Sequence, residues 1–127
     1  FLLEAGLPAD YINKPVKEYS KGMRQKVGIA LTVAKDASVL FLDEPTSGLD
    51  PQASNEFSEL LHKLRNKGVT VLMVTHDLFR AKEVANTIGI MNEGKLLKQI
   101  EADTISHTEL EVLYMNLIAG QHELEKL

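Results

Sequence analysis

Cysteine is absent from this sequence, which excludes a disulfide framework and a thiolate metal site. No apolar run approaches the roughly 20 residues that a membrane-spanning helix needs, and the N-terminus does not have the pattern of a signal peptide. Lys and Arg form no dense cluster and the net charge is -4, so we expect no nucleic-acid partner. Any link to a membrane is then expected to go through a partner protein.

What is present is ordinary for a globular domain or part of one: 44% of the 127 residues are apolar and 25% are charged. Residues 1–6 are typical of the last turns of a helix ending at Gly6, so the chain is expected to start within a fold. Ser20 is a suitable helix N-cap, and Gly68 a suitable helix end. The apolar periodicity predicts helices over residues 22–34, 51–68 and 78–85 and a last helix ending near Gly120, and strands over residues 39–43, 69–75, 87–91 and 96–100.

The order of these elements predicts the fold class. A strand, helix, strand, helix order implies an α/β fold with a parallel sheet. The first two strands are uninterrupted apolar runs, which is typical of parallel strands buried on both faces. The last two strands flank the turn-forming residues 92–94 and are expected to form a hairpin.

Two consecutive carboxylates, Asp43 and Glu44, follow the first apolar strand. Ligand sites in open α/β sheets lie at this end of the strands. Unpaired buried charges cost several kcal/mol, whereas a hydrated Mg²⁺ and an attacking water would use both carboxylates. The alternative is a solvated strand end without a ligand.

The residues around this pair make a specific combination. Thr-Ser-Gly-Leu-Asp follows at once over residues 46–50, and His76 ends the next strand. Together they resemble the ATP-binding-cassette (ABC) ATPases: Asp43 and Glu44 match the Walker B pair, residues 47–50 the D-loop, and residues 75–77 the switch-histidine region. The resemblance implies that Asp43 holds Mg²⁺, usually through water, that Glu44 polarises the attacking water as general base, and that His76 contacts the γ-phosphate of ATP.

A second match lies upstream, where Tyr-Ser-Lys-Gly-Met-Arg-Gln over residues 19–25 resembles the ABC signature motif, usually Leu-Ser-Gly-Gly-Gln. A helix N-terminus with a Ser hydroxyl and a glycine suits an anion. The resemblance implies nucleotide contacts from Ser20, Lys21, Gly22 and Met23, although Met23 cannot make the hydrogen bonds of Gln. This form of the motif is similar to that of ABC-2 type exporters, which favours export over import.

Asp50 has two interpretations that are compatible with each other. An acid before Pro51 caps a helix whatever else it does. The resemblance adds a role in the D-loop, which crosses the dimer interface in the family and links the two nucleotide sites.

A phosphate-binding Walker A motif is missing. Residues 89–96 fit most of the pattern G-x-x-x-x-G-K-[ST], but the last position is Leu96, and the segment joins two strands instead of leading into a helix. Because the backbone N–H groups and the Lys of Walker A supply most of the phosphate cradle, we expect no ATP hydrolysis by this chain alone.

The sequence therefore predicts a partial P-loop NTPase fold of the ABC type, with a parallel-sheet core, a C-terminal hairpin and helix, and the N-terminal part of the domain absent. The resemblance implies ATP and Mg²⁺ as cofactors, a second ATPase subunit in a homo- or heterodimer, and a transmembrane permease that holds the protein at the cytoplasmic face of the membrane. A soluble ABC ATPase without a membrane partner, and a non-catalytic fragment, stay open as alternatives. The expected parts are residues 1–35, the end of the signature-containing helical subdomain, residues 36–100, the catalytic core, and residues 101–127, the C-terminal helix and tail.

Overall fold

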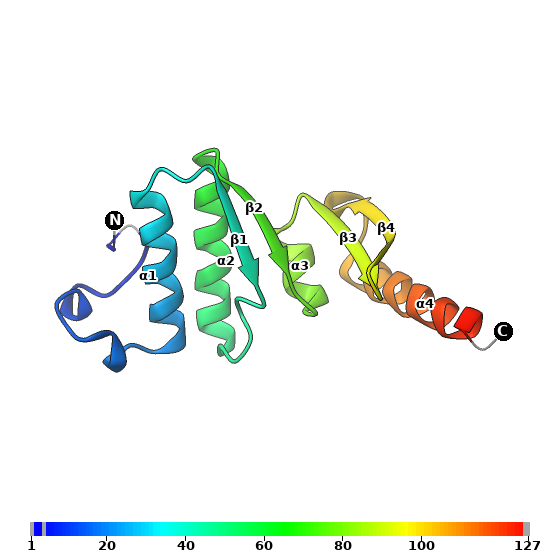
Figure 1. Ribbon diagram of the computed structural model, residues 1–127, viewed down its shortest axis with the longest axis horizontal. Helices are drawn as coiled ribbons and strands as arrows, with labels where there is room; N and C mark the ends of the chain where they lie inside the picture. The colour runs from blue at the N-terminus through cyan, green and yellow to red at the C-terminus, as the bar shows by residue number, and fades with distance from the viewer. Residues whose placement is uncertain (1, 4, 126–127) are drawn as a thin grey trace. The chain divides into compact units, whose positions relative to one another are not determined.

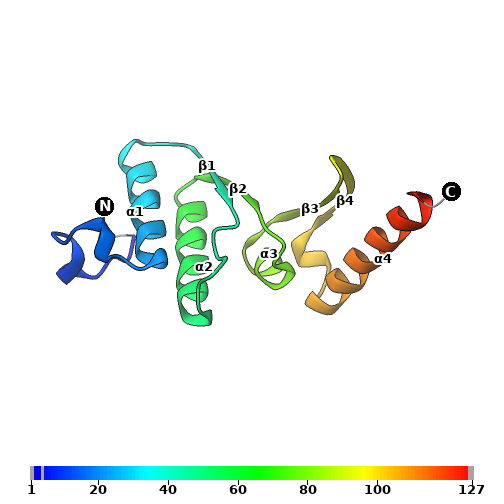
Figure 2. The same ribbon diagram turned by 60° about the horizontal axis from the view of Figure 1, so that its bottom comes forward.

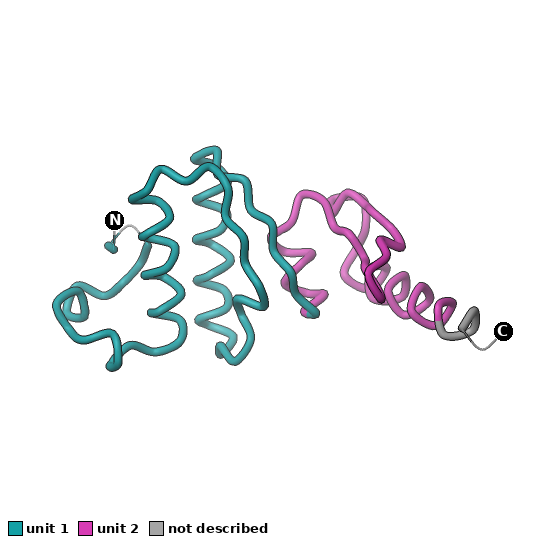
Figure 3. Tube along the Cα trace, in the orientation of Figure 1, with its two compact units in different colours: residues 1–76 teal, residues 77–127 magenta. Residues whose placement is uncertain are grey.

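The computed structural model describes residues 2–3 and 5–125. It comprises two compact units, residues 1–76 and residues 77–127 (Figure 3). Within the described part of the chain, no helix is long and apolar enough to cross a membrane.

The first unit contains two helices and a parallel pair of strands (Figure 1). Strands β1 (Val39–Asp43) and β2 (Thr70–Val74) pair in parallel from end to end, in register, which confirms the predicted α/β class with a parallel sheet. Two short 3-10 helices, η1 (Ala9–Tyr11) and η2 (Val16–Glu18), precede the first α-helix. The main elements are α1 (Lys21–Ala34), β1 (Val39–Asp43), α2 (Pro51–Asn66) and β2 (Thr70–Val74), all within two residues of the predicted bounds.

Local sequence signals set the ends of these elements. The Ser20 hydroxyl accepts a hydrogen bond from Met23 N–H at the start of α1, and the Asp50 carboxylate does the same for Ala53 N–H at the start of α2. Gly68 follows α2 at φ +87, a left-handed conformation that favours glycine. Its N–H donates to Arg65 O while Val69 N–H donates to Leu64 O, the hydrogen-bond pair of a Schellman helix end.

The same hydrogen-bond pair occurs at the start of the chain. Gly6 has φ +89, its N–H donates to Leu3 O, and Leu7 N–H donates to Leu2 O. These are the bonds of a helix C-terminus, as predicted for Gly6. The described residues before Gly6 lie in turns, and residues 1 and 4 of the predicted helical turns lie outside the described residues.

Helix α2 supplies much of the core of the first unit. Its side chains Phe57, Leu60, Leu61 and Leu64 are buried, and so is Leu40 on the strand face that α2 covers. The opposite face of the two strands is open (Figure 2). The apolar runs predict strands buried on both faces, but the described residues cover one face only, as expected for a chain that lacks part of its domain. The open face exposes Val39, Phe41, Leu72 and Val74.

The second unit is a hairpin with two helices, and its core contains Ile88, Ile90, Ala102 and Leu110. The predicted hairpin is confirmed, with β3 and β4 antiparallel around Glu93 and Gly94, both at positive φ as a two-residue hairpin loop requires. Its elements are α3 (Leu78–Val84), β3 (Thr87–Asn92), β4 (Lys95–Glu101), η3 (Ala102–Thr104) and α4 (His107–Glu125).

The predicted end of the last helix is wrong, because α4 continues past Gly120 to Glu125. Glycine inside a helix costs only about 1 kcal/mol relative to alanine, and the residues after Gly120 include good helix formers. The glycine therefore does not end this helix.

Candidate active site

One end of the first unit gathers the predicted site residues. In Figure 1 the N-terminal ends of α1 and α2 lie at the same end of this unit as the arrowheads of β1 and β2. Asp43 ends β1, and His76 follows β2 by two residues. Ser20 and Asp50 cap α1 and α2. The carboxyl ends of parallel strands are where open α/β sheets place their ligands.

Glu44 and His76, the two predicted catalytic residues, are in direct contact. Glu44 Oε1 accepts a hydrogen bond from His76 N–H at 2.9 Å and lies 2.8 Å from His76 Nδ1. Its other oxygen, Oε2, accepts from the Thr75 hydroxyl at 3.3 Å. Both oxygens of the carboxylate are thus held by Thr75 and His76, which follow β2 and lie 31 and 32 residues after Glu44 in the sequence.

The backbone of Glu44 has φ +46, in the left-handed region that residues with a Cβ seldom adopt. Its N–H continues the sheet by donating to Val74 O at 2.8 Å. The chain then turns at once, because Ser47 N–H donates to Glu44 O. This turn directs the Glu44 side chain toward the end of β2, where His76 lies.

These contacts set the protonation of Glu44. The hydrogen bond from the His76 ring is the largest influence, and it lowers the pKa of Glu44 below its ordinary value; the electrostatic effect of His76, its backbone N–H and the Thr75 hydroxyl act in the same direction. Partial burial raises the pKa and opposes this effect only in part. Glu44 is therefore ionised at neutral pH, as a general base must be. The His76 side chain is 80% exposed, so it also remains accessible to a ligand.

Asp43, the predicted metal ligand, is exposed at the end of β1. Among the described residues no group of three or more acidic or His side chains could enclose a metal ion. Mg²⁺ does not need such a group, because it is commonly bound by one or two carboxylates together with waters and substrate phosphates. The exposed Asp43 carboxylate fits a hydrated Mg²⁺ of this kind.

The residues predicted to contact the nucleotide lie at the start of α1. Ser20 Oγ accepts from Met23 N–H at 3.2 Å, which leaves the hydroxyl proton free to donate to an anion. The first turn of α1 contains no acidic residue, so nothing there offsets the positive end of the helix dipole. A methyl group on Gly22 would meet Leu49 and Ala53 at 3.7 and 3.8 Å, ordinary contact distances, so packing alone does not require glycine there.

The loop over residues 44–50 lies beside Lys21 and ends at Asp50. A methyl group on Gly48 would lie 3.7 Å from Lys21 Nζ, so the Lys21 side chain passes over this loop. Asp50 Oδ1 accepts from Ala53 N–H at 2.8 Å, and the predicted cap is therefore present. The structure brings Glu44 and His76 into contact, and it places Lys21 beside the same loop.

Sequence reasoning missed two polar contacts at this site. Thr75 was assigned no separate role, yet its hydroxyl binds Glu44. Gln25 Nε2 donates to Pro45 O at 2.8 Å and so joins α1 to the residue after Glu44. Both side chains lie inside matched motifs, which was the available signal, but Gln25 and Thr75 bind partners 20 and 31 residues away in the sequence.

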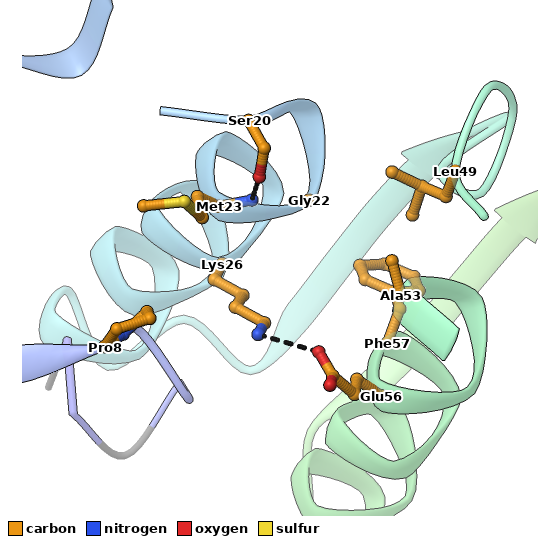
Figure 4. Close-up of a pocket in the computed structure, with 9 residues that line it drawn as sticks. All are labelled: Pro8, Ser20, Gly22, Met23, Lys26, Leu49, Ala53, Glu56 and Phe57. Carbon is orange, nitrogen blue, oxygen red and sulfur yellow. Dashed lines mark hydrogen bonds and ion pairs between the residues drawn. The ribbon is translucent and has the colours of Figure 1, made fainter. Parts of the chain in front are cut away.

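A pocket of about 210 Å³ lies beside the start of α1 (Figure 4). Met23, Leu49 and Phe57 contribute to its apolar lining, and Ser20 lies at its edge. Lys26 and Glu56 form an ion pair across it at 3.1 Å, joining α1 to α2. Lys26 also donates to Gly6 O, which attaches the first residues of the chain to α1.

Comparisons with known proteins agree with this geometry. Residues 10–79 match the family described as "AAA domain, putative AbiEii toxin, Type IV TA system". The lantibiotic transport ATP-binding protein SrtF of Streptococcus pyogenes is 37% identical over 105 residues, which cover 83% of this chain and 45% of that protein. The energy-coupling factor transporter ATP-binding protein EcfA2 of Bacillus cereus is 40% identical over 115 residues, 88% of this chain and 39% of that protein. The chain thus spans less than half the length of these curated relatives.

Solved structures show the same fold. The CbiO1 protein of Clostridium perfringens, part of the ABC transporter complex cbiONQ, matches 99% of this chain and 51% of its own with a TM-score of 0.75 and 27% identity. The dimeric ATP-binding cassette MJ0796 bound to ADP and Pi matches 80% of this chain and 44% of its own, with a TM-score of 0.68 and 28% identity. The chain therefore has a partial P-loop NTPase fold.

Proposed function

Because this chain belongs to the AAA-domain family that it matches, and because its relatives and structural neighbours are ABC ATPases, we propose that it is part of a transporter subunit that binds and hydrolyses ATP. The observation that carries this proposal is the Glu44 carboxylate at the end of β1, which Thr75 and His76 hold on both oxygens. A carboxylate fixed and ionised at this edge of a parallel sheet is suited to accept a proton from an attacking water.

In this proposal Glu44 is the general base and His76 is its partner. Contact with His76 lowers the pKa of Glu44 and fixes the direction of its carboxylate, while the exposed ring of His76 remains available to the γ-phosphate. Asp43 holds Mg²⁺, which supplies charge stabilisation for the phosphates when bound. The work of these residues is positioning and electrostatics, which dominate phosphoryl transfer.

We propose that the start of α1 contacts the ATP held by a second ATPase subunit. Ser20 offers a hydroxyl proton, Lys21 a positive charge, and the backbone N–H groups around Gly22 the positive end of a helix dipole. Met23 contributes its backbone N–H to the Ser20 cap and its side chain to the apolar pocket. Asp50 caps α2 and is proposed to lie at the boundary between the two subunits.

The whole protein is proposed to act with a transmembrane permease at the cytoplasmic face of the membrane. Its relatives include a lantibiotic transport protein and, in Lactococcus lactis, the methionine import protein MetN, 39% identical over 92 residues that cover 72% of this chain and 25% of that protein. We propose export for this chain, since its signature has the Tyr-Ser-Lys-Gly-Met-Arg-Gln form over residues 19–25. Uptake into inside-out membrane vesicles, rather than right-side-out ones, is the expected result for an exporter.

The test of the catalytic proposal is the ATPase rate of the full-length protein. Glu44→Gln keeps the size of the side chain but removes the base, and we expect the rate to fall about 10²–10⁴-fold. Glu59→Gln makes the same chemical change at an exposed position of α2 and should leave the rate unchanged. A full rate in Glu44→Gln would show that another group is the base.

The 127-residue chain is the third sample in this assay. We propose that it does not hydrolyse ATP by itself, because its sequence holds no Walker A motif to supply the phosphate cradle. A rate in this sample that depends on Glu44 would overturn the proposal and would mean that residues of this chain bind the phosphates.

A further inference from the structure

Gln25 connects two parts of the candidate site that the sequence motifs treat separately. It lies in the second turn of α1, five residues after Ser20, and its Nε2 donates to Pro45 O at 2.8 Å. Pro45 is fully buried and directly follows Glu44. The hydrogen bond therefore joins α1 to Pro45, the residue next to the proposed base.

Other bonds also shape and place the loop after β1. Ser47 N–H donates to Glu44 O and Leu49 N–H to Thr46 O within the turn, and Glu44 N–H joins the first residue of the loop to Val74 O of β2. Gln25 attaches the loop to α1. Gly22 of α1 also lies near Leu49, so the helix approaches the same loop at a second point.

We propose that Gln25 is a positioning residue that makes the orientation of Glu44 depend on the position of α1. This inference rests on the proposed function, in which Ser20 contacts the ATP of the second subunit and Glu44 acts on the ATP of its own. Nucleotide contact at the start of α1 is then transmitted through Gln25 and Pro45 to Glu44. An N–H donor in the side chain at position 25 therefore affects the rate of ATP hydrolysis, and it does not affect the affinity for ATP.

The test is the steady-state ATPase activity of the full-length protein with Gln25→Glu. This change keeps the shape of the side chain but replaces the N–H donor by an acceptor that repels Pro45 O. We expect kcat to fall about tenfold, the effect of losing one positioning hydrogen bond, with KM for ATP and Tm unchanged. Gln99→Glu, the same change at an exposed position of β4, serves as the matched control and should behave as wild type.

Two further variants separate positioning from folding. Gln25→Lys restores an N–H donor and should recover kcat to within about threefold of wild type, whereas Gln25→Met should not. In the Glu44→Gln background, Gln25→Glu should have no additional effect, because Gln25 acts through Glu44.

The outcomes distinguish this inference from the proposed function. If Glu44→Gln abolishes activity but Gln25→Glu keeps the wild-type kcat, the proposed function stands and the role of Gln25 is overturned. If Gln25→Glu and Gln25→Lys lower kcat and Tm together, Gln25 only supports the fold and the inference is again overturned. If Glu44→Gln is fully active, the proposed function itself fails.

Discussion

Replacing Asp50 separates a structural role from a functional one at a single side chain. Asp50 Oδ1 caps α2 through a 2.8 Å hydrogen bond to Ala53 N–H, and α2 supplies four buried apolar side chains to the core of the first unit. Loss of an N-cap costs about 0.5–2 kcal/mol, and loss of a negative charge at a helix N-terminus about 0.3–1 kcal/mol. We therefore expect Asp50→Ala to lower the free energy of unfolding by about 1–2 kcal/mol.

Asp50→Asn is the matched variant, because asparagine caps as well as aspartate does. This variant should lose only the stabilisation from the negative charge, which lowers the free energy of unfolding by at most about 1 kcal/mol. Urea unfolding of the full-length protein, followed by circular dichroism, measures this difference. An ATPase rate that falls in both variants, although Asp50→Asn stays folded, would establish a role beyond the cap. The reasoning fails if Asp50→Ala is as stable as wild type, or if the two variants are equally destabilised.

Three other predictions concern the core, the titration of the site and the open face of the sheet. Leu110 is fully buried, so Leu110→Ala should cost about 2–5 kcal/mol in urea unfolding, against less than about 0.5 kcal/mol for the exposed Met115→Ala. Because His76 lowers the pKa of Glu44, His76→Ala should shift the acid limb of kcat/KM against pH to higher pH, and an unshifted limb would contradict the assigned contact. Phe41 is 73% exposed, so Phe41→Ala should hardly change the stability of the 127-residue chain. In the full-length protein, where we expect the open face to be covered, the same substitution should lower the free energy of unfolding by about 3–5 kcal/mol. Equal effects in the two proteins would contradict that cover.

The elements of this fold were predictable where local signals agree. Ser20 and Asp50 each stand before a helical pattern, and the continuous apolar runs of β1 and β2 indicate strands. Gly120 shows the limit of such signals, because one glycine weakens a helix without ending it. The exposure of Phe41 has no signal in the apolar run itself, which does not say which part of a protein covers each face; it follows instead from the expected absence of the N-terminal part of the domain.

For the site, the motifs predict candidate residues but not the contacts that orient them. Glu44 and His76 were predicted separately, and their contact follows from the parallel pairing of β1 with β2, which brings both strand ends to one edge. Thr75 and Gln25 bind partners 31 and 20 residues away, and a polar side chain has no sequence signal that names its partner at such a separation. Local patterns therefore predict which residues are candidates for the site, while tertiary pairing determines how these residues are held.

The backbone of Glu44 provides a last and independent test of how the site is held. At φ +46 this residue occupies a conformation that costs residues with a Cβ about 1 kcal/mol or more, whereas glycine adopts it freely. Glu44→Gly should therefore be more stable than Glu44→Ala by about 1 kcal/mol in thermal unfolding, although both lack the carboxylate. At Glu59, inside α2, the same pair of substitutions should give the opposite order, because glycine there is about 1 kcal/mol worse than alanine. If alanine is the more stable replacement at both positions, the left-handed turn is not maintained at Glu44, and the orientation of its carboxylate toward His76 must have another cause.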